Sequence, residues 1–281
     1  MELFYFKFFN PGSPFRRCAI VWFFTRRIHI RMNGNGSVLI IPARFGSSRL
    51  PGKPLKEIDG RTLIEHVYRR VEQVRGVDRL LVATDDDRIE SVVRAFGGDV
   101  VMTRSDHVSG TDRLAEAAAD FPDDTIVVNV QGDEPLIEPQ VIERVLDVAH
   151  LGDSDVVTVM TEMTDPEAIQ DRNHVKVVAD QNGFALYFSR SPIPSSGKTF
   201  LHIGLYAYPV RFLRTFETLT PTPLEQAERL EQLRILENGY RIRVVEVESE
   251  SWGIDTPADL KAFETFLRRA KGPAQMTGTN T

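Results

Sequence analysis

The sequence has very little cysteine and no long apolar run. A single cysteine, Cys18, among 281 residues excludes a disulfide within the chain. Because such a chain suits a reducing compartment, we expect a cytoplasmic protein. The apolar run Cys18–Phe24 spans about seven residues, far short of the ~20 that a bilayer-spanning helix needs. We therefore expect no stable membrane association.

Acidic residues outnumber basic ones in most of the chain. The formal net charge is −6, yet residues 1–37 hold six lysines and arginines and one acid, a balance of +5. The rest of the chain therefore carries −11. An acidic body argues against nucleic-acid binding. Any attraction for a polyanionic nucleotide must come from a few local cations and a metal ion.

Residues 1–31 also lack the pattern of a signal peptide. Arginines lie on both sides of the apolar run, and no small-residue cleavage site follows it. Met32 comes six residues before the first expected strand, which suggests an upstream extension of the reading frame. An anchor on a membrane surface is the alternative. We expect a poorly ordered extension over 1–37, one domain over 38–270 and a disordered tail over 271–281.

The common phosphate-binding fingerprints are absent. Five residues, not four, separate Gly46 from Gly52, and Pro54 follows Lys53 where a P-loop has Ser or Thr. The same two glycines do not fit the dinucleotide spacing either. A phosphate loop of another kind remains, because three cations and several small residues follow a strand here.

That loop begins after the apolar run Val38–Ile41, which predicts a strand buried on both faces of a parallel sheet. Pro42 has no N–H to donate to a ladder, so we expect the strand to end there. The loop cations are Arg44, Arg49 and Lys53. Cations and close backbone N–H groups after a first strand favour phosphate binding. A surface turn with solvated cations is the alternative.

Beyond this loop, strand-like and helix-like segments alternate. Strands are predicted at 80–83, 99–102, 125–130, 155–160, 175–179, 185–189, 202–208 and 241–247, and helices at 62–74, 87–96, 111–120, 222–237 and 256–269. The early alternation indicates βαβ units, and the later strands indicate a mixed extension of the sheet. We predict an α/β fold: a Rossmann-like mixed, mostly parallel sheet with helices on both faces. The loops after Ile41, Ala83, Met102 and Val130 should share one crevice.

Asp133 follows the strand predicted at 125–130, next to Gly132. A carboxylate at a strand's carboxyl end, beside a residue that permits close approach, suits a magnesium ligand. A turn aspartate that bonds its own backbone is the alternative. For Asp255 and Ser109, simple helix capping explains the local sequence.

Several motifs together resemble the sugar nucleotidylyltransferase family and, within it, the 3-deoxy-manno-octulosonate cytidylyltransferases. They stand in the family's order between about residues 38 and 268. The motifs are Pro-Ala-Arg-Phe-Gly-Ser-Ser-Arg-Leu-Pro-Gly-Lys-Pro at 42–54, Asn-Val-Gln-Gly-Asp-Glu-Pro at 129–135, Tyr-Phe-Ser-Arg-Ser-Pro-Ile-Pro at 187–194, His-Ile-Gly-Leu-Tyr-Ala-Tyr at 202–208, Leu-Glu-Gln at 224–226 and Gly-Ile-Asp-Thr-Pro at 253–257.

The resemblance implies a magnesium-dependent enzyme of the nucleotide-diphospho-sugar transferase fold. It would transfer CMP from CTP to 3-deoxy-D-manno-octulosonate (Kdo), releasing pyrophosphate, as a step of lipopolysaccharide biosynthesis. CTP, Kdo and Mg²⁺ would be its small-molecule partners. The family is typically a homodimer, so we expect one here.

The resemblance also assigns roles to matching residues. The implied catalytic residues are Lys53, Arg49, Asp133 and Asp255, with Asp133 and Asp255 as the metal ligands. The implied nucleotide-binding residues are Ala43, Arg44, Lys53, Arg104, Ser109 and Gln131. The implied sugar-binding residues are Gln131, Arg190, His202, Tyr206, Glu225 and Gln226.

Ordinary structural roles stay open for the sugar-side residues. His202 fits a half-buried strand position, Tyr206 fits the core, and Glu225 fits the acid of a capping box. His202 and Tyr206 should face the same side of their strand, because their spacing is even.

Three other functions stay open. The first is transfer to another acid sugar, such as sialic acid, or from another nucleotide. The second is a catalytically inactive nucleotide-binding regulatory module, against which Lys53, Asp133 and Asp255 argue. The third is a glycosyltransferase that holds its metal with Asp85-Asp86-Asp87, although capping of the next helix explains that triplet.

Overall fold

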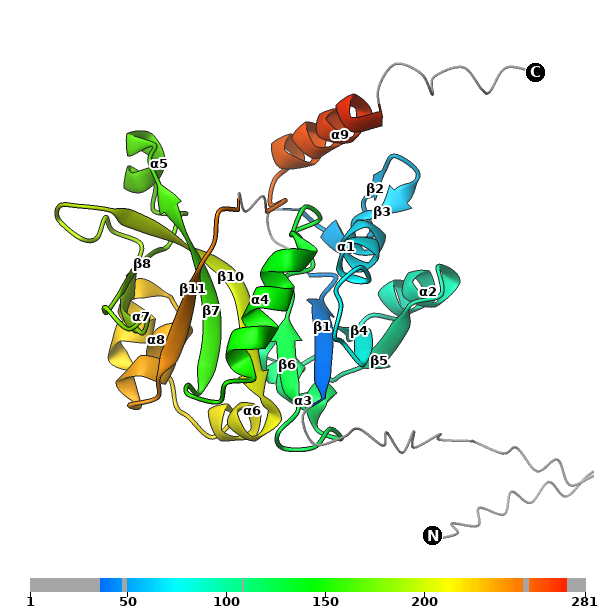
Figure 1. Cartoon of the computed structure of the whole chain (residues 1–281). Helices are drawn as coiled ribbons and strands as arrows, with labels where there is room; N and C mark the ends of the chain where they lie inside the picture. The colour runs from blue at the N-terminus through cyan, green and yellow to red at the C-terminus, as the bar shows by residue number, and fades with distance from the viewer. Residues whose placement is uncertain (1–35, 47–49, 108, 250–252, 272–281) are drawn as a thin grey trace, which may run out of the picture. The chain divides into compact units, whose positions relative to one another are not determined.

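A nine-stranded sheet with helices packed against it forms the fold (Figure 1). The computed structural model describes residues 36–46, 50–107, 109–249 and 253–271, all within one compact unit, Met32–Thr281. The predictions for the amino-terminal extension up to residue 35, and for the tail after residue 271, lie outside the described residues.

The strands are β1 (Ser37–Ala43), β2 (Glu57–Ile58), β3 (Arg61–Thr62), β4 (Arg79–Thr84), β5 (Asp99–Met102), β6 (Ile126–Asn129), β7 (Val156–Met163), β8 (Lys176–Ala179), β9 (Ala185–Ser189), β10 (Thr199–Pro209) and β11 (Ile242–Glu246). The helices are η1 (Lys53–Leu55), α1 (Leu63–Val71), α2 (Asp87–Ala95), α3 (Gly110–Ala118), α4 (Pro139–Ala149), α5 (Pro166–Gln170), α6 (Val210–Phe216), α7 (Pro223–Glu228), α8 (Gln232–Glu237) and α9 (Pro257–Lys271). β2 and β3 form a separate small hairpin.

The main sheet has the strand order β11-β7-β10-β6-β1-β4-β5, with β8 paired to β10 and β9 paired to β8. The pairs β6–β1, β1–β4, β4–β5 and β7–β11 are parallel. β10 runs antiparallel between β6 and β7 and joins the two parallel parts. The predicted α/β class and the mixed extension in the second half are therefore confirmed.

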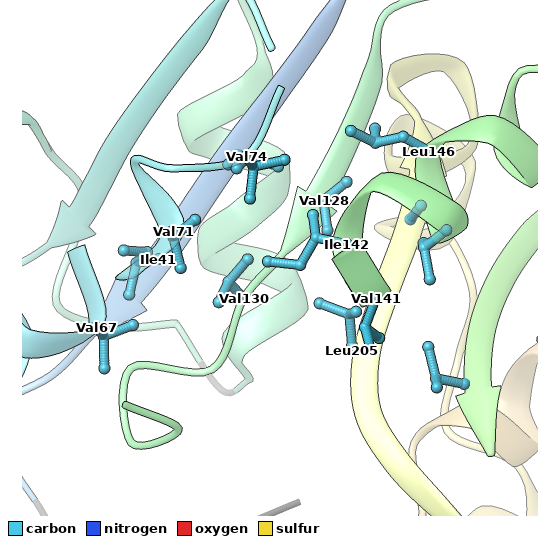
Figure 2. Close-up of a cluster of buried hydrophobic side chains, with 14 of the residues drawn as sticks. Ile41, Val67, Val71, Val74, Val128, Val130, Val141, Ile142, Leu146 and Leu205 are labelled. Carbon is cyan, nitrogen blue, oxygen red and sulfur yellow. The ribbon is translucent and has the colours of Figure 1, made fainter. Parts of the chain in front are cut away.

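The core lies on both faces of β1. Leu39 and Ile41 pack into a cluster with Val67 and Val71 of α1 and Ile142 of α4 (Figure 2). Successive side chains of a strand point to opposite faces. Val38 and Ile40, which alternate with this pair, are also fully buried, and α3 contacts β1 as well. The sheet is therefore covered by helices on both faces, and its carboxyl-end loops are left to form a site.

The strand β1 does not end at Pro42, so that prediction was wrong. Pro42 pairs with Ala83 and the strand continues to Ala43. On its other side, the register with β6 ends at Ile40. Beyond Ile40, β1 pairs with β4 only. On the unpaired side, the missing N–H of a proline breaks no ladder bond.

The helix predicted over 222–237 is two helices, α7 and α8. The capping box of Thr222 and Glu225 opens α7 as expected. Arg229 then adopts a left-handed conformation, with φ of 56°, which ends α7 after six residues. Four helices, η1, α4, α5 and α6, were not predicted. Helical periodicity cannot reveal a break that one residue's backbone angle creates.

Among the residues that the structure describes, no helix has both the length and the apolar character to cross a bilayer.

Candidate active site

A pocket of about 370 Å³ opens at the carboxyl ends of β1, β5 and β6. This volume is within the usual range for small-molecule sites. Its lining comes from the loop after β1, the start of α3 and the loop after β6, together with Asp255: Pro42, Ala43, Arg44, Gly46, Lys53, Pro54, His107, Ser109, Gly110, Arg113, Gln131, Gly132, Asp133 and Asp255. Three of the four predicted loops thus meet. The loop after β4 contributes Asp85, which pairs with Arg113 at 3.1 Å.

Lys53 joins the two aspartates of this pocket. Its Nζ donates to Asp133 Oδ2 at 2.6 Å and to Asp255 Oδ1 at 2.9 Å. The lysine side chain is 14% exposed and the two aspartate side chains 29% and 41%. Burial acts to lower the pKa of Lys53, but Asp133 and Asp255 outweigh it and hold that pKa above its ordinary value. The lysine is therefore charged at neutral pH.

The loop after β1 delivers Lys53 through a tight turn at Gly52. Gly52 has φ of 66°, in the left-handed region that favours glycine. A Cβ there would lie 3.1 Å from the ring of Phe45. The Gly52 N–H donates to the Phe45 carbonyl at 3.2 Å, so the two ends of the loop are held together. Arg88 of α2 stacks on Phe45, with its guanidinium carbon 3.4 Å from the ring centroid.

The loops that carry the two aspartates also touch each other. Ile254 N–H donates to the Asp133 carbonyl at 2.9 Å. Gly132 permits the close approach of β6 to β1, since a Cβ there would lie 3.2 Å from the Pro42 carbonyl oxygen. These contacts bring Asp133 and Asp255 to one place, although 122 positions separate them in the sequence.

Helix capping does not require Asp255. Thr256 and Asp259 form the reciprocal bonds at the start of α9, with Thr256 N–H to Asp259 Oδ2 at 2.8 Å and Asp259 N–H to Thr256 Oγ1 at 3.2 Å. The Asp255 carboxylate points instead toward Lys53. The position of Asp255 is therefore explained by its contact with Lys53 in the pocket rather than by helix capping.

The donor set fits magnesium when substrate supplies further ligands. Mg²⁺ prefers oxygen ligands and is commonly held by one or two carboxylates together with phosphate oxygens. Asp133 and Asp255 each direct one oxygen at the same ammonium, so a single ion is within reach of both. Within the described ranges, no group of three or more His, Cys, Asp or Glu residues could hold a metal alone.

The start of α3 forms another wall of the pocket. Ser109 does cap this helix, through a reciprocal pair with Asp112, and also lines the pocket. His107 lies beside it with a nearly buried side chain, and its Nε2 hydrogen-bonds to Glu116. Burial opposes the effect, but the bond from His107 lowers the pKa of Glu116 below its usual value. Arg113, fixed by Asp85, also faces the pocket.

Gln131 connects the pocket to β10. Its Nε2 donates to the Gly204 carbonyl at 2.8 Å. The pairing of β10 with β7 shifts register between Ile203 and Tyr206. This irregularity leaves the Gly204 carbonyl to face Gln131 rather than a strand.

His202 and Tyr206 lie side by side on β10, with ring centroids 5.3 Å apart. Thr158 donates to the Leu205 carbonyl at 2.8 Å, so its hydroxyl accepts from His202 Nε2 at 2.9 Å. Burial lowers the pKa of His202 to about 3, which keeps the ring neutral. Burial, and to a lesser extent Glu231, raises the pKa of Tyr206. The expected common orientation of His202 and Tyr206 is confirmed, although neither lines the pocket.

Three other predicted residues lie away from the pocket lining. Arg104 is exposed near Asp106 and Glu116. Glu225 pairs with Arg234, with 2.8 Å from Nε to Oε2, and Gln226 is exposed on α7. Arg49 lies outside the described residues.

Arg190 is anchored to the backbone of neighbouring segments. Its Nε donates to the Glu228 carbonyl at 3.0 Å, and its Nη1 donates to the Arg172 carbonyl at 3.1 Å. A third bond, at 3.4 Å, joins Nη2 to the Arg229 carbonyl. These bonds tie β9 to the break between α7 and α8.

A second Leu-Glu-Gln run, at 230–232, was missed in the sequence and is closer to the site. Glu231 Oε2 accepts from Thr111 Oγ1 of α3 at 2.5 Å, and its charge acts on Tyr206. Gln232 is buried. The signal was present, because the motif at 224–226 is repeated six residues later. Only the break at Arg229 turns the two copies to different surroundings.

The fold and the pocket define a nucleotide-binding α/β protein, with its ligand site at the carboxyl ends of parallel strands. A family model described as cytidylyltransferase matches residues 38–242. The chain belongs to this cytidylyltransferase family.

Close relatives carry two sugar names. The chain is 52% identical to a 3-deoxy-manno-octulosonate cytidylyltransferase of Syntrophotalea carbinolica, over 82% of this chain and 97% of that protein. It is 48% identical to an 8-amino-3,8-dideoxy-manno-octulosonate cytidylyltransferase of Shewanella pealeana, with the same coverage. A solved CMP:2-keto-3-deoxy-manno-octonic acid synthetase in complex with CTP is similar in structure, with a TM-score of 0.80 and 44% identity over 84% of this chain and 100% of that one.

Proposed function

We propose that this protein transfers CMP from CTP to the anomeric hydroxyl of Kdo, giving CMP-Kdo and pyrophosphate. The observation that carries the proposal is the meeting of Lys53, Asp133 and Asp255 in a pocket beside a glycine-containing cationic loop. A cation and two metal-binding carboxylates at one point suit phosphoryl transfer, in which catalysis is mostly positioning and charge neutralisation. The names of the relatives supply the substrates.

In this reaction a bond forms between the anomeric oxygen and the α-phosphorus. The bond from the α-phosphorus to the bridging oxygen breaks, and pyrophosphate leaves with the electron pair. Arg44 and Lys53 would hold the triphosphate at the loop after β1. Asp133 and Asp255 would hold Mg²⁺, which when bound neutralises phosphate charge and acidifies the attacking hydroxyl. The hydroxyl proton then passes to water, and no side-chain base is required.

The nucleoside would lie against the start of α3. Ser109 and Arg113 offer hydrogen-bond donors in the pocket wall, and His107 is fixed by Glu116. Gln131 lies between this wall and β10. We therefore assign the ribose and base to this side, with Gln131 at the border between the nucleotide and the sugar.

The sugar would lie toward β10 and the start of α8. His202 and Tyr206 lie there together, with Glu231 close to Tyr206. We assign hydroxyl recognition to this group and replace Glu225 and Gln226 by Glu231 and Gln232. Arg190 would act through the backbone that it holds. Glu231→Gln should therefore raise KM for the sugar more than KM for CTP, with Glu225→Gln as the matched comparison.

A pyrophosphate-release assay with a panel of substrates tests the function. CTP with Kdo should give turnover, whereas sialic acid, or UTP in place of CTP, should give little. The similarity to relatives named for the 8-amino sugar makes 8-amino-3,8-dideoxy-manno-octulosonate the second candidate acceptor. Faster turnover with that sugar would replace Kdo in the proposal, and an absence of pyrophosphate with every pair would favour the inactive regulatory module. The homodimer and the cytoplasmic location stay predictions.

A further inference from the structure

The Lys53 ammonium lies where a metal held by Asp133 and Asp255 would lie. It contacts one oxygen of each carboxylate, at 2.6 and 2.9 Å. Those distances place both oxygens within direct contact of one small cation. Because Mg²⁺ binds carboxylate oxygens at ~2.0–2.1 Å, an ion that used the same two oxygens would occupy the space of the ammonium.

Electrostatic repulsion also opposes the presence of both the ammonium and a metal ion between the two carboxylates. A divalent ion and the ammonium would repel each other in this partly buried pocket, because screening by water is weak there. The lysine side chain is mostly buried, so it cannot simply turn into bulk solvent while staying charged. It needs another anionic partner before it can leave the carboxylates.

The proposed substrate supplies that partner. Lys53 opens η1 directly after the cationic loop, so its flexible four-carbon chain begins beside the expected triphosphate. Moving the ammonium from the aspartates to a phosphate keeps its charge paired. The same movement frees both carboxylate oxygens for a metal.

We propose that Lys53 and the divalent ion exclude each other between Asp133 and Asp255, so the free protein keeps the metal out until a nucleotide's phosphates draw the ammonium away. This inference rests on the proposed metal and triphosphate sites. It makes nucleotide and metal binding mutually favourable, and that coupling is reciprocal. It also protects the carboxylate pair from idle metal binding in the absence of substrate.

Mn²⁺ binding to the full chain without nucleotide tests the proposal, with free Mn²⁺ measured by electron paramagnetic resonance. Lys53→Met removes the ammonium and keeps the side-chain length. We expect its Mn²⁺ affinity to exceed the wild-type value by roughly tenfold or more, within the usual range of coupling between sites. An equal or weaker affinity would overturn the proposal.

Arg44→Met is the matched control, because Arg44 is another cation of the same pocket. It should raise Mn²⁺ affinity by less than about threefold, since a charge that acts only through screened solvent has a small effect. An equal gain in Arg44→Met would mean that general pocket charge, not exclusion by Lys53, controls the metal.

A double variant locates the ion. Lys53→Met with Asp255→Asn should lose the affinity gained by Lys53→Met. A retained gain would place Mn²⁺ elsewhere and overturn the proposal. The melting temperature of each variant is measured to check that the variant is folded. The Mn²⁺ measurement does not depend on the sugar. If the wild-type protein shows no Kdo-dependent turnover but the variants change Mn²⁺ affinity as expected, the proposed function is rejected and the mutual exclusion of Lys53 and the metal is retained.

Discussion

At the scale of single residues, one ammonium group links the two halves of the site. Lys53 is held in the pocket by a glycine turn and by two carboxylates from distant loops. Its ammonium pairs with both aspartates, so we expect its main contribution to be charge. Substitutions there should separate activity from stability.

Lys53→Ala should lower kcat/KM by on the order of 10²-fold or more, about 2.7 kcal/mol of transition-state stabilisation, because the proposed triphosphate site loses a direct cation. The melting temperature should change little. Steady-state kinetics with CTP and Kdo check this, and Lys56→Ala, an exposed lysine three residues later, is the control. Near-normal turnover of Lys53→Ala would make Lys53 a structural charge only.

His202 should make stability depend on pH on the acid side. Burial lowers its pKa to about 3 in the folded protein, whereas the unfolded chain keeps the ordinary value of about 6.5. Between these values the unfolded state binds the proton and the folded state does not. Stability is therefore lost as pH falls from about 6.5 toward 3, by up to about 1.4 kcal/mol per pH unit.

Urea unfolding of wild-type protein and His202→Gln across this pH range measures the effect. The variant should lose less stability on acidification, because it lacks the titrating ring. If the free energy of unfolding falls equally with pH in the two proteins, His202 does not titrate differently in the folded and unfolded states.

At the scale of elements, β8 and β9 are held to neighbouring segments by the polar contacts of two cations. Lys176 of β8 is fully buried, and its Nζ donates to the carbonyls of Asp171, His174 and Arg190. Arg190 extends this connection to Arg172 and to the end of α7. Together these two cations fix the loop before β8 against the end of β9 and the break before α8.

Lys176→Met should lower the free energy of unfolding by about 2–4 kcal/mol, because three carbonyls lose their donor in a buried place. Urea denaturation gives this value. Lys198→Met is the control: Lys198 pairs with Glu162 at 2.6 Å on the surface, and such pairs contribute about 1 kcal/mol or less. Equal losses in the two variants would contradict the role of Lys176 as a buried tether.

At the scale of the whole molecule, the site exists only where the ends of the chain's two halves meet. Asp133 follows β6 in the first half, and Asp255 precedes α9 near the end. Their loops join through the bond from Ile254 to Asp133. The two aspartates should therefore behave as one functional unit.

Asp133→Asn and Asp255→Asn should each remove most turnover while the protein stays folded, because amide groups keep the shape but not the charge that the proposed Mg²⁺ needs. The double variant should be little worse than either single one, since the first change already disrupts the shared site. Kinetics over a range of Mg²⁺ concentrations check this, and raised Mg²⁺ should partly rescue a single variant. Multiplicative losses would mean that the carboxylates act independently.

Deleting residues 1–31 should leave activity and thermal stability unchanged. The first core strand, β1, begins at Ser37, and the family model matches from residue 38. Comparison of the full chain with a chain that starts at Met32, by kinetics and thermal melting, tests this. Loss of folded enzyme on deletion would contradict it, and binding of the full chain to lipid vesicles would favour the membrane-surface anchor.

The sequence by itself determined the class of fold and the position of the cationic loop after β1. Apolar runs, helical periodicity and capping residues are local signals, and the strands from β4 to β9 follow them within a few residues. The spacing of Gly46, Gly52 and Lys53 is equally local, and it alone excludes the common phosphate motifs. The sequence motifs also singled out Lys53, Asp133 and Asp255.

Only the tertiary structure decided what those residues do to one another. Lys53 lies 80 positions from Asp133 and 202 from Asp255, and no local pattern records the strand order that brings them together. The same limit applies to the two Leu-Glu-Gln copies, which differ in surroundings because of one left-handed residue, Arg229. The periodicity of side chains depends only on residues that are near each other in the chain. The site depends on which strand ends and loops pack side by side, and these come from distant parts of the chain.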